Sequence, residues 1–561
     1  MRAAIAVILV LIATLLLLAA TVPTFDFDEA LYRRVAEEMK QSHDYFVMTW
    51  DGKPFYEKPP TYIWSIVAAS LLVDGRSPHV SVFASRLPSV ICSLATFFLL
   101  AWFWRRMAPH YARAFGTTID DSRRWLLSPA LPLLACGTGL FATGGAASVV
   151  LDPMLTLFLL APLLVFAGAV LRDDLRLTFS EIMIAGLGMA AATAVKGLVG
   201  IVLPALALGA HALLTRRMRQ LGGVISAFAV AVAVAAMFYV IVYQFTGPQF
   251  FREFFIRQHF MRAMTPLQGH RGPLLFHVAI VALIGGPLVA FVLRSLPRTS
   301  EIGFGRWGFP LTWTATVIVF YSAMATKLPN YTWPVWPALV LTLCILIVRA
   351  YSECEKRRAR WLALAAYLCL TPVAAAFILL GAGADVWIHP SYTPRAAMML
   401  SAIEPVPISV RIGLVIVGVA LAMQILELRT FGHQLDRRSR LLWKSLASAV
   451  VLNCLALSTV STIVLPFADR SLRGPLVRLS RDAWTEHAGE DLTTVGLFSP
   501  TVSSSYGGAS VRQVGRFPRA FARSRRQQLL LMPAWQAAAC REPDCVVLKR
   551  DEYLMLCRRT Q

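Results

Sequence analysis

Three carboxylates follow closely on the N-terminal apolar stretch, where they could act at the surface of a membrane. They lie in the segment 25–32, at Asp26, Asp28 and Glu29. Acidic residues at the start of a helix can cap it and interact with its positive end, which accounts for one carboxylate more readily than for three. A carboxylate at a membrane face can also act as a general base or stabilise a developing cation. The sequence leaves both interpretations open.

A lysine next to two prolines is the second candidate. The run is Glu57-Lys58-Pro59-Pro60, and the prolines fix an extended turn that holds Glu57 and Lys58 rigidly. Lysine is a good point-charge partner for phosphate. It can equally snorkel to the membrane surface beside interfacial aromatic residues. Lys58 is therefore either a phosphate ligand or a membrane anchor.

Asp152 lies within an apolar run, between Leu151 and Pro153. An aspartate in the centre of a span costs about 2.5–3.5 kcal/mol, so it needs a partner or a purpose. Pro153 in the first turn predicts that Asp152 is the N-cap of a helix. Capping and function are both compatible with this pattern. Lys196, at a turn between two apolar runs, is expected to snorkel.

Two further segments contribute cations and a phenol. Lys327 and Tyr331 lie in a proline-fixed turn. Residues 252–271 are rich in arginine and histidine, which would bind anionic headgroups at a lipid surface; the charged and histidine side chains are Arg252, Glu253, Arg257, His259, Arg262, His270 and Arg271. Together, the segments offer the carboxylates and cations that transfer from an anionic lipid carrier would need.

The surrounding sequence is typical of a protein that crosses a membrane many times. Of its 561 residues, 57% are hydrophobic and 15% are charged, whereas soluble domains average about 25% charged residues. Apolar runs of about 20 residues match the thickness of a bilayer, which argues against a soluble protein. The net charge of +22 reflects arginines between the apolar runs, as the positive-inside rule expects. Nucleic acid is not an expected partner.

We predict an all-α polytopic membrane domain over residues 1–464. Its thirteen spanning helices lie near residues 3–22, 80–104, 125–143, 149–171, 179–195, 197–214, 222–245, 273–294, 307–326, 331–350, 361–382, 409–428 and 441–464. The arginine bias places the N-terminus in the cytoplasm and the C-terminus outside. All the candidate residues above then fall on the outer, periplasmic face.

Three long segments lie on that face. Residues 21–79 contain an amphipathic stretch, 28–41, and residues 246–272 are rich in Phe and Arg, so both predict interfacial helices. Residues 465–561 predict a small soluble α/β domain with a strand near 544–549. Cys540 and Cys545 could form a disulfide there.

These motifs resemble those of a known enzyme family. Asp28-Glu29-x-x-Tyr32, followed by Tyr56-Glu57-Lys58-Pro59-Pro60, resembles the lipid A aminoarabinose transferases, which are part of the protein O-mannosyltransferase-like GT-C glycosyltransferases. The Leu151–Pro153 helix start, the segment with His259 and Arg262, and the turn 327–331 follow in the family's order. The resemblance is good over roughly residues 5–350.

The resemblance implies roles for individual residues. It implies that Asp28, Glu29 and Asp152 are catalytic acidic residues, and that the carrier phosphate is bound by four side chains, Lys58, Arg262, Lys327 and Tyr331. Glu57 and His259 would be a pair able to hold a divalent metal such as zinc, although no cofactor is required. The implied reaction is inverting transfer of a sugar from a polyprenyl phosphate to lipid A in the bacterial inner membrane.

Other functions are compatible with part of this pattern. A protein hydroxyl, another glycolipid or a cell-wall polymer could be the acceptor. A lipid transporter would also have many spans and intramembrane charges, but it should show internal repeats and helices broken near the midplane. Neither is evident in the sequence.

Overall fold

The structure of the chain is a computed structural model. It describes mainly residues 2–22, 27–115, 148–174, 176–266, 272–282 and 304–350. Short pieces are described elsewhere, chiefly at 127–129 and 131–132, at scattered positions of 408–422 and 478–486, and in five strands between 492 and 559.

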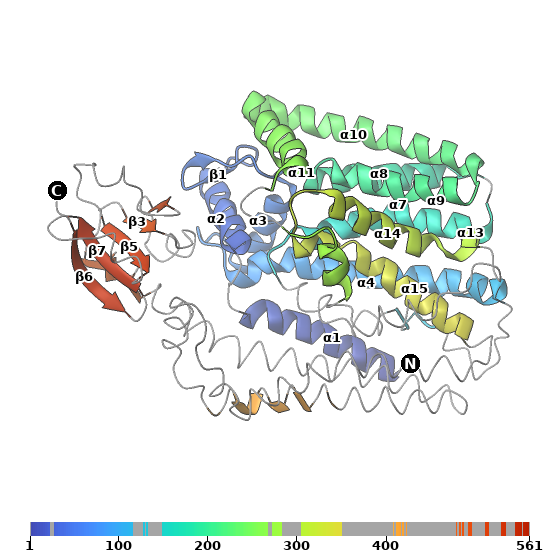
Figure 1. The fold of residues 1–561 in the computed structure, drawn as a ribbon, viewed down its shortest axis with the longest axis horizontal. Helices are drawn as coiled ribbons and strands as arrows, with labels where there is room; N and C mark the ends of the chain where they lie inside the picture. Colours follow the sequence, from blue (N-terminus) through green and yellow to red (C-terminus); the bar gives the residue numbers. More distant parts are fainter. Residues whose placement is uncertain are drawn as a thin grey trace.

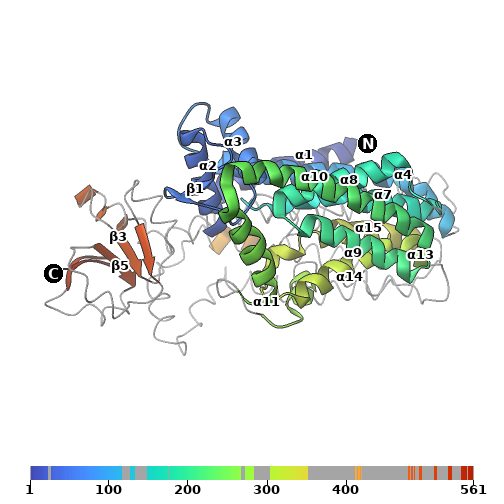
Figure 2. The same cartoon turned by 90° about the horizontal axis from the view of Figure 1, so that it is seen from above.

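The described part is a bundle of long apolar helices that run side by side (Figures 1 and 2). They are α1 (Arg2–Thr21), α4 (Val82–Ala114), α7 (Asp152–Arg172), α8 (Phe179–Lys196), α9 (Val199–Leu214), α10 (Met218–Phe251), α14 (Phe309–Ala323) and α15 (Val335–Ala350). Each coincides with a predicted span. Of the described helices, five are long and apolar enough to cross a membrane, namely Val82–Ala114, Asp152–Arg172, Phe179–Lys196, Met218–Met264 and Pro329–Arg349.

Other predicted spans fall outside the described residues. Those near 125–143, 361–382, 409–428 and 441–464 do so entirely or largely, and the span near 273–294 is described only up to residue 282, as a helix from Phe276. The predicted number of thirteen spans therefore stays a prediction.

Burial distinguishes central from peripheral helices. The α15 helix is buried along its length, with Val335, Leu341 and Ile345 each at 0% exposure. The α10 helix instead leaves large apolar side chains such as Met237 and Phe245 exposed. An exposed apolar surface of this extent fits contact with lipid.

The predicted amphipathic helix forms as α2 (Phe27–Ser42). Leu31, Val35 and Met39 are its buried face, as their spacing predicts. The next helix, α3 (Thr61–Val73), was not predicted. At 13 residues it is too short to cross a bilayer, so a search for spans of about 20 residues misses it.

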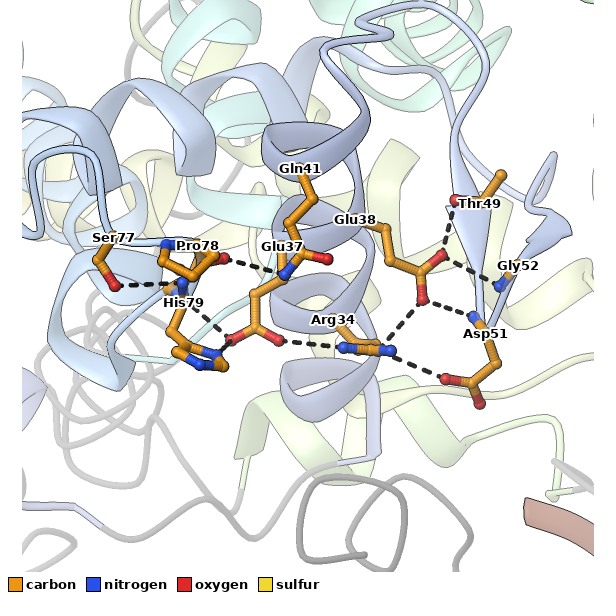
Figure 3. A network of polar contacts seen from close by, with 11 residues as sticks. Arg34, Glu37, Glu38, Gln41, Thr49, Asp51, Gly52, Ser77, Pro78 and His79 are labelled. Atoms are coloured by element: carbon orange, nitrogen blue, oxygen red, sulfur yellow. Dashed lines mark hydrogen bonds and ion pairs between the residues drawn. The ribbon is translucent and has the colours of Figure 1, made fainter. Parts of the chain in front are cut away.

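A hairpin and a polar network hold α2 in place. Strands β1 (Thr49–Trp50) and β2 (Lys53–Pro54) pair across Asp51 and Gly52, whose φ angles of 50° and 71° suit a type I′ turn. Glu38 of α2 accepts hydrogen bonds from the Thr49 hydroxyl (2.6 Å) and from the backbone N–H groups of Asp51 (2.8 Å) and Gly52 (3.2 Å) (Figure 3). These bonds fix the orientation of the helix whose first turn contains Asp28.

A buried ion pair joins α1, α2 and α4. The Arg86 guanidinium donates to Glu29 and to the backbone carbonyls of Ala19 and Val22. The Arg86 and Glu29 side chains are only 1% and 5% exposed. The pair therefore sets the start of α2 against the bundle.

The segment after α10 turns away from the bundle. Gly247 has a φ of 67°, which breaks the helix. A π-helix (Arg252–Met261) and the short α11 (Arg262–Met264) follow, so the predicted interfacial helix of 246–272 is present over most of its length. The chain returns through α13 (Phe304–Trp307) to α14, and a 3₁₀ turn, η5 (Pro329–Thr332), precedes α15.

The C-terminal residues form a five-stranded sheet with the order β4-β3-β5-β7-β6. Its strands are β3 (Leu492–Val495), β4 (Val511–Val514), β5 (Leu529–Pro533), β6 (Cys545–Asp551) and β7 (Leu554–Arg559). β6 confirms the strand predicted near 544–549. Cys540 lies outside the described residues, so its pairing with Cys545 stays a prediction.

Replacing Glu29 by Gln should destabilise the protein by about 3–5 kcal/mol, because Arg86 would keep a buried charge without its carboxylate. Thermal unfolding in detergent measures this. The exposed pair of Glu253 and Arg257 (29% and 56%) gives a matched control, since Glu253→Gln should cost at most about 1 kcal/mol. Equal losses in the two variants would contradict the structural role of Glu29.

Candidate active site

Six segments at one end of the bundle, called here the α2 end (Figure 1), contribute charged and polar residues to one site. These segments are the start of α2, the loop before α3, the start of α7, the end of α8, α11 and η5. The residues they contribute are Asp28, Glu57, Lys58, Asp152, Lys196, Arg262, Asn330 and Tyr331. The opposite, α13 end contains the starts of α8, α10 and α14.

Lys58 is the point on which these charges converge. Burial lowers the pKa of its ammonium group to about 8, and the nearby Arg262 charge acts in the same direction. The carboxylates of Glu57 and Asp28 act against this shift, and the Lys196 charge adds to it. Two carboxylates and three cations thus lie within electrostatic reach of one another.

Tyr32 connects Asp152 to the same group. Burial raises the pKa of the Tyr32 phenol well above its usual value, and the carboxylates of Asp28, Glu57 and Asp152 add to the rise. The site therefore contains three carboxylates and three cations. Asp28, Lys58 and Asp152, which are far apart in the sequence, are brought together.

The Asp152 carboxylate is held by two partners. It is 1% exposed, it forms an ion pair with the Lys196 ammonium group, and its other oxygen accepts a hydrogen bond from the Asn330 amide at 2.9 Å. The N-cap of α7 is Leu151, without a side-chain bond. The prediction that Asp152 is the N-cap is wrong, because its carboxylate turns toward α8 and η5 instead.

Lys196 also differs from its prediction. It is 13% exposed and bound to Asp152, so it does not snorkel to solvent. Its ammonium group lies 4.9 Å from the centre of the Tyr331 ring, within the range of a cation–π interaction. Tyr331 in turn stacks on Tyr321 with ring centres 4.5 Å apart. An aspartate inside an apolar run, such as Asp152, needs a polar partner. A search of the sequence for such partners could have assigned Lys196 and Asn330 to the site.

A cavity lies one helical turn beyond Asp152. Its walls come from α4, α7 and the η5–α15 segment. The buried hydroxyls of Ser93, Thr96 and Thr156 line it without a hydrogen-bond partner. Such groups are commonly satisfied by water.

Two predicted site residues are bound elsewhere. The Lys327 ammonium group donates to the backbone carbonyls of Tyr321, Ser322 and Met324, and so caps the C-terminal end of α14. This placement differs from the predicted contact with the carrier phosphate. Glu29 was predicted to be catalytic, but it lies in the buried pair with Arg86.

The predicted metal pair does not have the geometry of a metal site. The His259 ring donates from Nδ1 to the Phe254 carbonyl (2.8 Å), and its Nε2 accepts from the Leu198 N–H (3.2 Å). No nitrogen lone pair is left to bind zinc, which usually takes four ligands. Within the described part of the chain, no three His, Cys, Asp or Glu side chains are grouped as metal ligands.

Comparisons with known proteins agree with this architecture. No family model matches the chain. The chain is similar to undecaprenyl phosphate-alpha-4-amino-4-deoxy-L-arabinose arabinosyl transferases. It is 26% identical over 330 residues to the enzyme of Proteus mirabilis, an alignment that covers 59% of this chain and 56% of the relative. It is 27% identical over 342 residues to the enzyme of Pseudomonas savastanoi, with 59% of each chain covered. The alignments thus span less than two thirds of the relatives' length.

Two solved structures share this fold. ArnT from Cupriavidus metallidurans bound to undecaprenyl phosphate matches with a TM-score of 0.67 at 18% identity, covering 100% of this chain and 97% of that one. The same protein in the apo state gives 0.66. The predicted resemblance to aminoarabinose transferases is confirmed, as is the helical membrane fold.

Replacing Lys327 by Met should lower the free energy of unfolding by about 1.5–3 kcal/mol, because charge-assisted bonds to α14 carbonyls are lost. Thermal unfolding of the purified protein measures this. A Lys327→Met protein with wild-type stability but weakened binding of a lipid phosphate would instead restore the predicted phosphate contact.

Proposed function

We propose that the protein is an integral-membrane glycosyltransferase that moves a sugar from a polyprenyl phosphate to an acceptor in the bacterial envelope. The observation that carries this proposal is the convergence of Asp28, Lys58 and Asp152 with Lys196 and Arg262 at one end of an apolar bundle. The names of its relatives suggest 4-amino-4-deoxy-L-arabinose as the sugar and undecaprenyl phosphate as the carrier. The motif resemblance favours lipid A as the acceptor.

The cations supply what departure of the carrier needs. A polyprenyl phosphate is a good leaving group once its negative charge is neutralised, so transfer needs charge stabilisation more than an acid. Lys58 and Arg262 would bind the phosphate, with the Tyr331 phenol beside them. Lys196 would add a third positive charge.

Asp28 would act at the reacting carbon. Displacement there passes through an oxocarbenium-like state, which a carboxylate stabilises. A hydroxyl acceptor would use Asp28 as a general base, whereas a lipid A phosphate is already anionic and would not need one. Direct displacement inverts the anomeric centre. Asp28 and Glu57 could also attract the positive amino group of an aminoarabinose.

Asp152 has a supporting role in this scheme. Both oxygens of Asp152 are engaged by Lys196 and Asn330, so we infer that this residue holds Lys196 in place and does not attack the sugar. No metal step is needed, and the site residues give none a place.

The charge distribution supports a periplasmic site. Arg105, Arg106, Arg216, Arg217 and Arg219 lie at the α13 end, opposite the site. The positive-inside rule then puts the α13 end and the N-terminus in the cytoplasm. We propose thirteen spans over 1–464, periplasmic loops at 21–79 and 246–272, and a periplasmic domain over 465–561, whose sheet lies toward the α2 end in Figures 1 and 2.

A different acceptor is the main competing possibility. A protein hydroxyl, another glycolipid or a cell-wall polymer would leave the donor chemistry unchanged, and a lipid transporter would have no transfer activity. Mass spectrometry of lipid A, other glycolipids and envelope proteins, with and without the gene, separates these cases. An envelope with no change in glycosylation would contradict the proposal.

Replacing Asp28 by Asn should lower transfer by about 10²–10⁴-fold, because the carboxylate is lost while the side chain keeps its size. Transfer by purified protein from a polyprenyl-phosphate sugar measures this. Asp174→Asn, the same change at an exposed ion pair with Arg172 near the α13 end, is the matched control and should retain activity. Full activity of Asp28→Asn would remove Asp28 from the mechanism.

The Lys58 pKa of about 8 predicts a pH dependence. Because this pKa is lowered, the cation is present below about pH 8 and is lost as the pH rises through that value. The ratio kcat/KM for donor, which reports the free enzyme, should therefore fall between about pH 7 and 9. Lys58→Arg should abolish this fall, since guanidinium stays charged. Identical pH profiles for the two proteins would refute the assignment.

A further inference from the structure

The turn between α8 and α9 is tightly packed against the π-helix. Gly197 ends α8 with a φ of 76°, a conformation that favours glycine. A Cβ atom at this position would lie 2.3 Å from His259 Nε2 and 2.7 Å from the Phe254 ring. The residue just before this glycine is Lys196, so the contact bears directly on the position of that cation.

His259 closes the contact with both ring nitrogens, and its Nε2 also lies 3.3 Å from the backbone carbonyl oxygen of Lys196. Its Nδ1–H donates to the Phe254 carbonyl within the π-helix (2.8 Å), and its Nε2 accepts from the Leu198 N–H (3.2 Å). Leu198 precedes α9 as its N-cap and has no side-chain cap of its own. The imidazole thus serves as the acceptor that this helix start otherwise lacks.

An aromatic cluster surrounds the same contact. Its buried members are Val242, Phe250, Phe254 and Phe255, and Tyr56, Leu198, Phe238 and Tyr239 pack against them. Tyr56 is two residues before Lys58, Leu198 is two residues after Lys196, and Phe254 belongs to the π-helix that leads to Arg262. The cluster therefore joins the three segments that carry the cations of the site.

We propose that His259 is a positioning residue that locks the Lys196 turn to the π-helix, and so sets the spacing of Lys196 and Arg262 around the carrier phosphate. This inference rests on the proposed function only where it names the phosphate. It replaces the metal-ligand role that the family resemblance implied, since both ring nitrogens are already used by the main chain. His259 is expected to touch neither sugar nor phosphate.

Three variants test whether His259 holds the Lys196 turn against the π-helix. His259→Phe keeps a ring but loses both hydrogen bonds, His259→Gln can still accept from the Leu198 N–H, and His110→Phe changes a histidine at the far end of α4. We expect His259→Phe to weaken binding of undecaprenyl phosphate by about tenfold, with a smaller effect on kcat at saturating donor. His259→Gln should recover most of the affinity, and His110→Phe should behave as wild type.

Hydrogen exchange provides a readout independent of transfer. Backbone amides of the peptide covering residues 196–201 should exchange faster in His259→Phe than in wild type, and at nearly the wild-type rate in His259→Gln. Unchanged exchange of these amides in His259→Phe would contradict the positioning role of His259. Absence of undecaprenyl phosphate binding by wild type, with the exchange difference present, would instead contradict the proposed function alone.

Metal content separates this role from metal binding. We expect purified wild-type protein to contain no stoichiometric divalent metal by elemental analysis, and its lipid-phosphate affinity to survive chelation. A stoichiometric metal ion that is lost in both His259→Phe and His259→Gln would overturn the proposal. Gly197→Ala gives a further check: its added methyl should weaken lipid-phosphate binding, and combining it with His259→Ala should give less than the sum of the two losses.

Discussion

Mutual repulsion among three cations is the constraint on which the structure of the site depends. At an effective dielectric constant of about 20, like charges 4–8 Å apart repel by about 2–4 kcal/mol. Burial lowers the pKa of the Lys58 ammonium group, and the Arg262 and Lys196 charges lower it further. The carboxylates of Asp28, Glu57 and Asp152 offset the repulsion. A phosphate would relieve it further, so the arrangement is suited to an anionic ligand.

The bundle assembles these charges from helix ends. Asp152 begins α7, where the positive end of the helix favours a carboxylate, and Lys196 ends α8, where the negative end favours a cation. Alternating helices of an up-and-down bundle bring such ends to the same side. Packing then fixes their separation, through the Glu38 network around α2 and the aromatic cluster around Gly197.

Several residues whose chemistry would suit catalysis or ligand binding have structural roles instead. Glu29 pairs with Arg86, Lys327 caps α14, and the His259 ring bonds to the main chain. A charged or ionisable side chain inside an apolar bundle must be paired wherever it lies. Its type and its neighbours in the sequence therefore cannot distinguish a catalytic group from a structural one.

The sequence by itself determined the eight apolar spans that the described helices confirm and the amphipathic face of α2, because span length and helical periodicity are local properties. It also predicted that Asp28, Lys58 and Asp152 lie at one end, because the arginine bias orients alternate spans. Only the tertiary structure decided the partners. Asp152 binds Lys196 and Asn330, which are 44 and 178 residues away in the chain, and the short helix α3 packs against α2 and α4. Hydrogen-bond partners depend on how helices pack in three dimensions, and spacing along the chain does not contain that information.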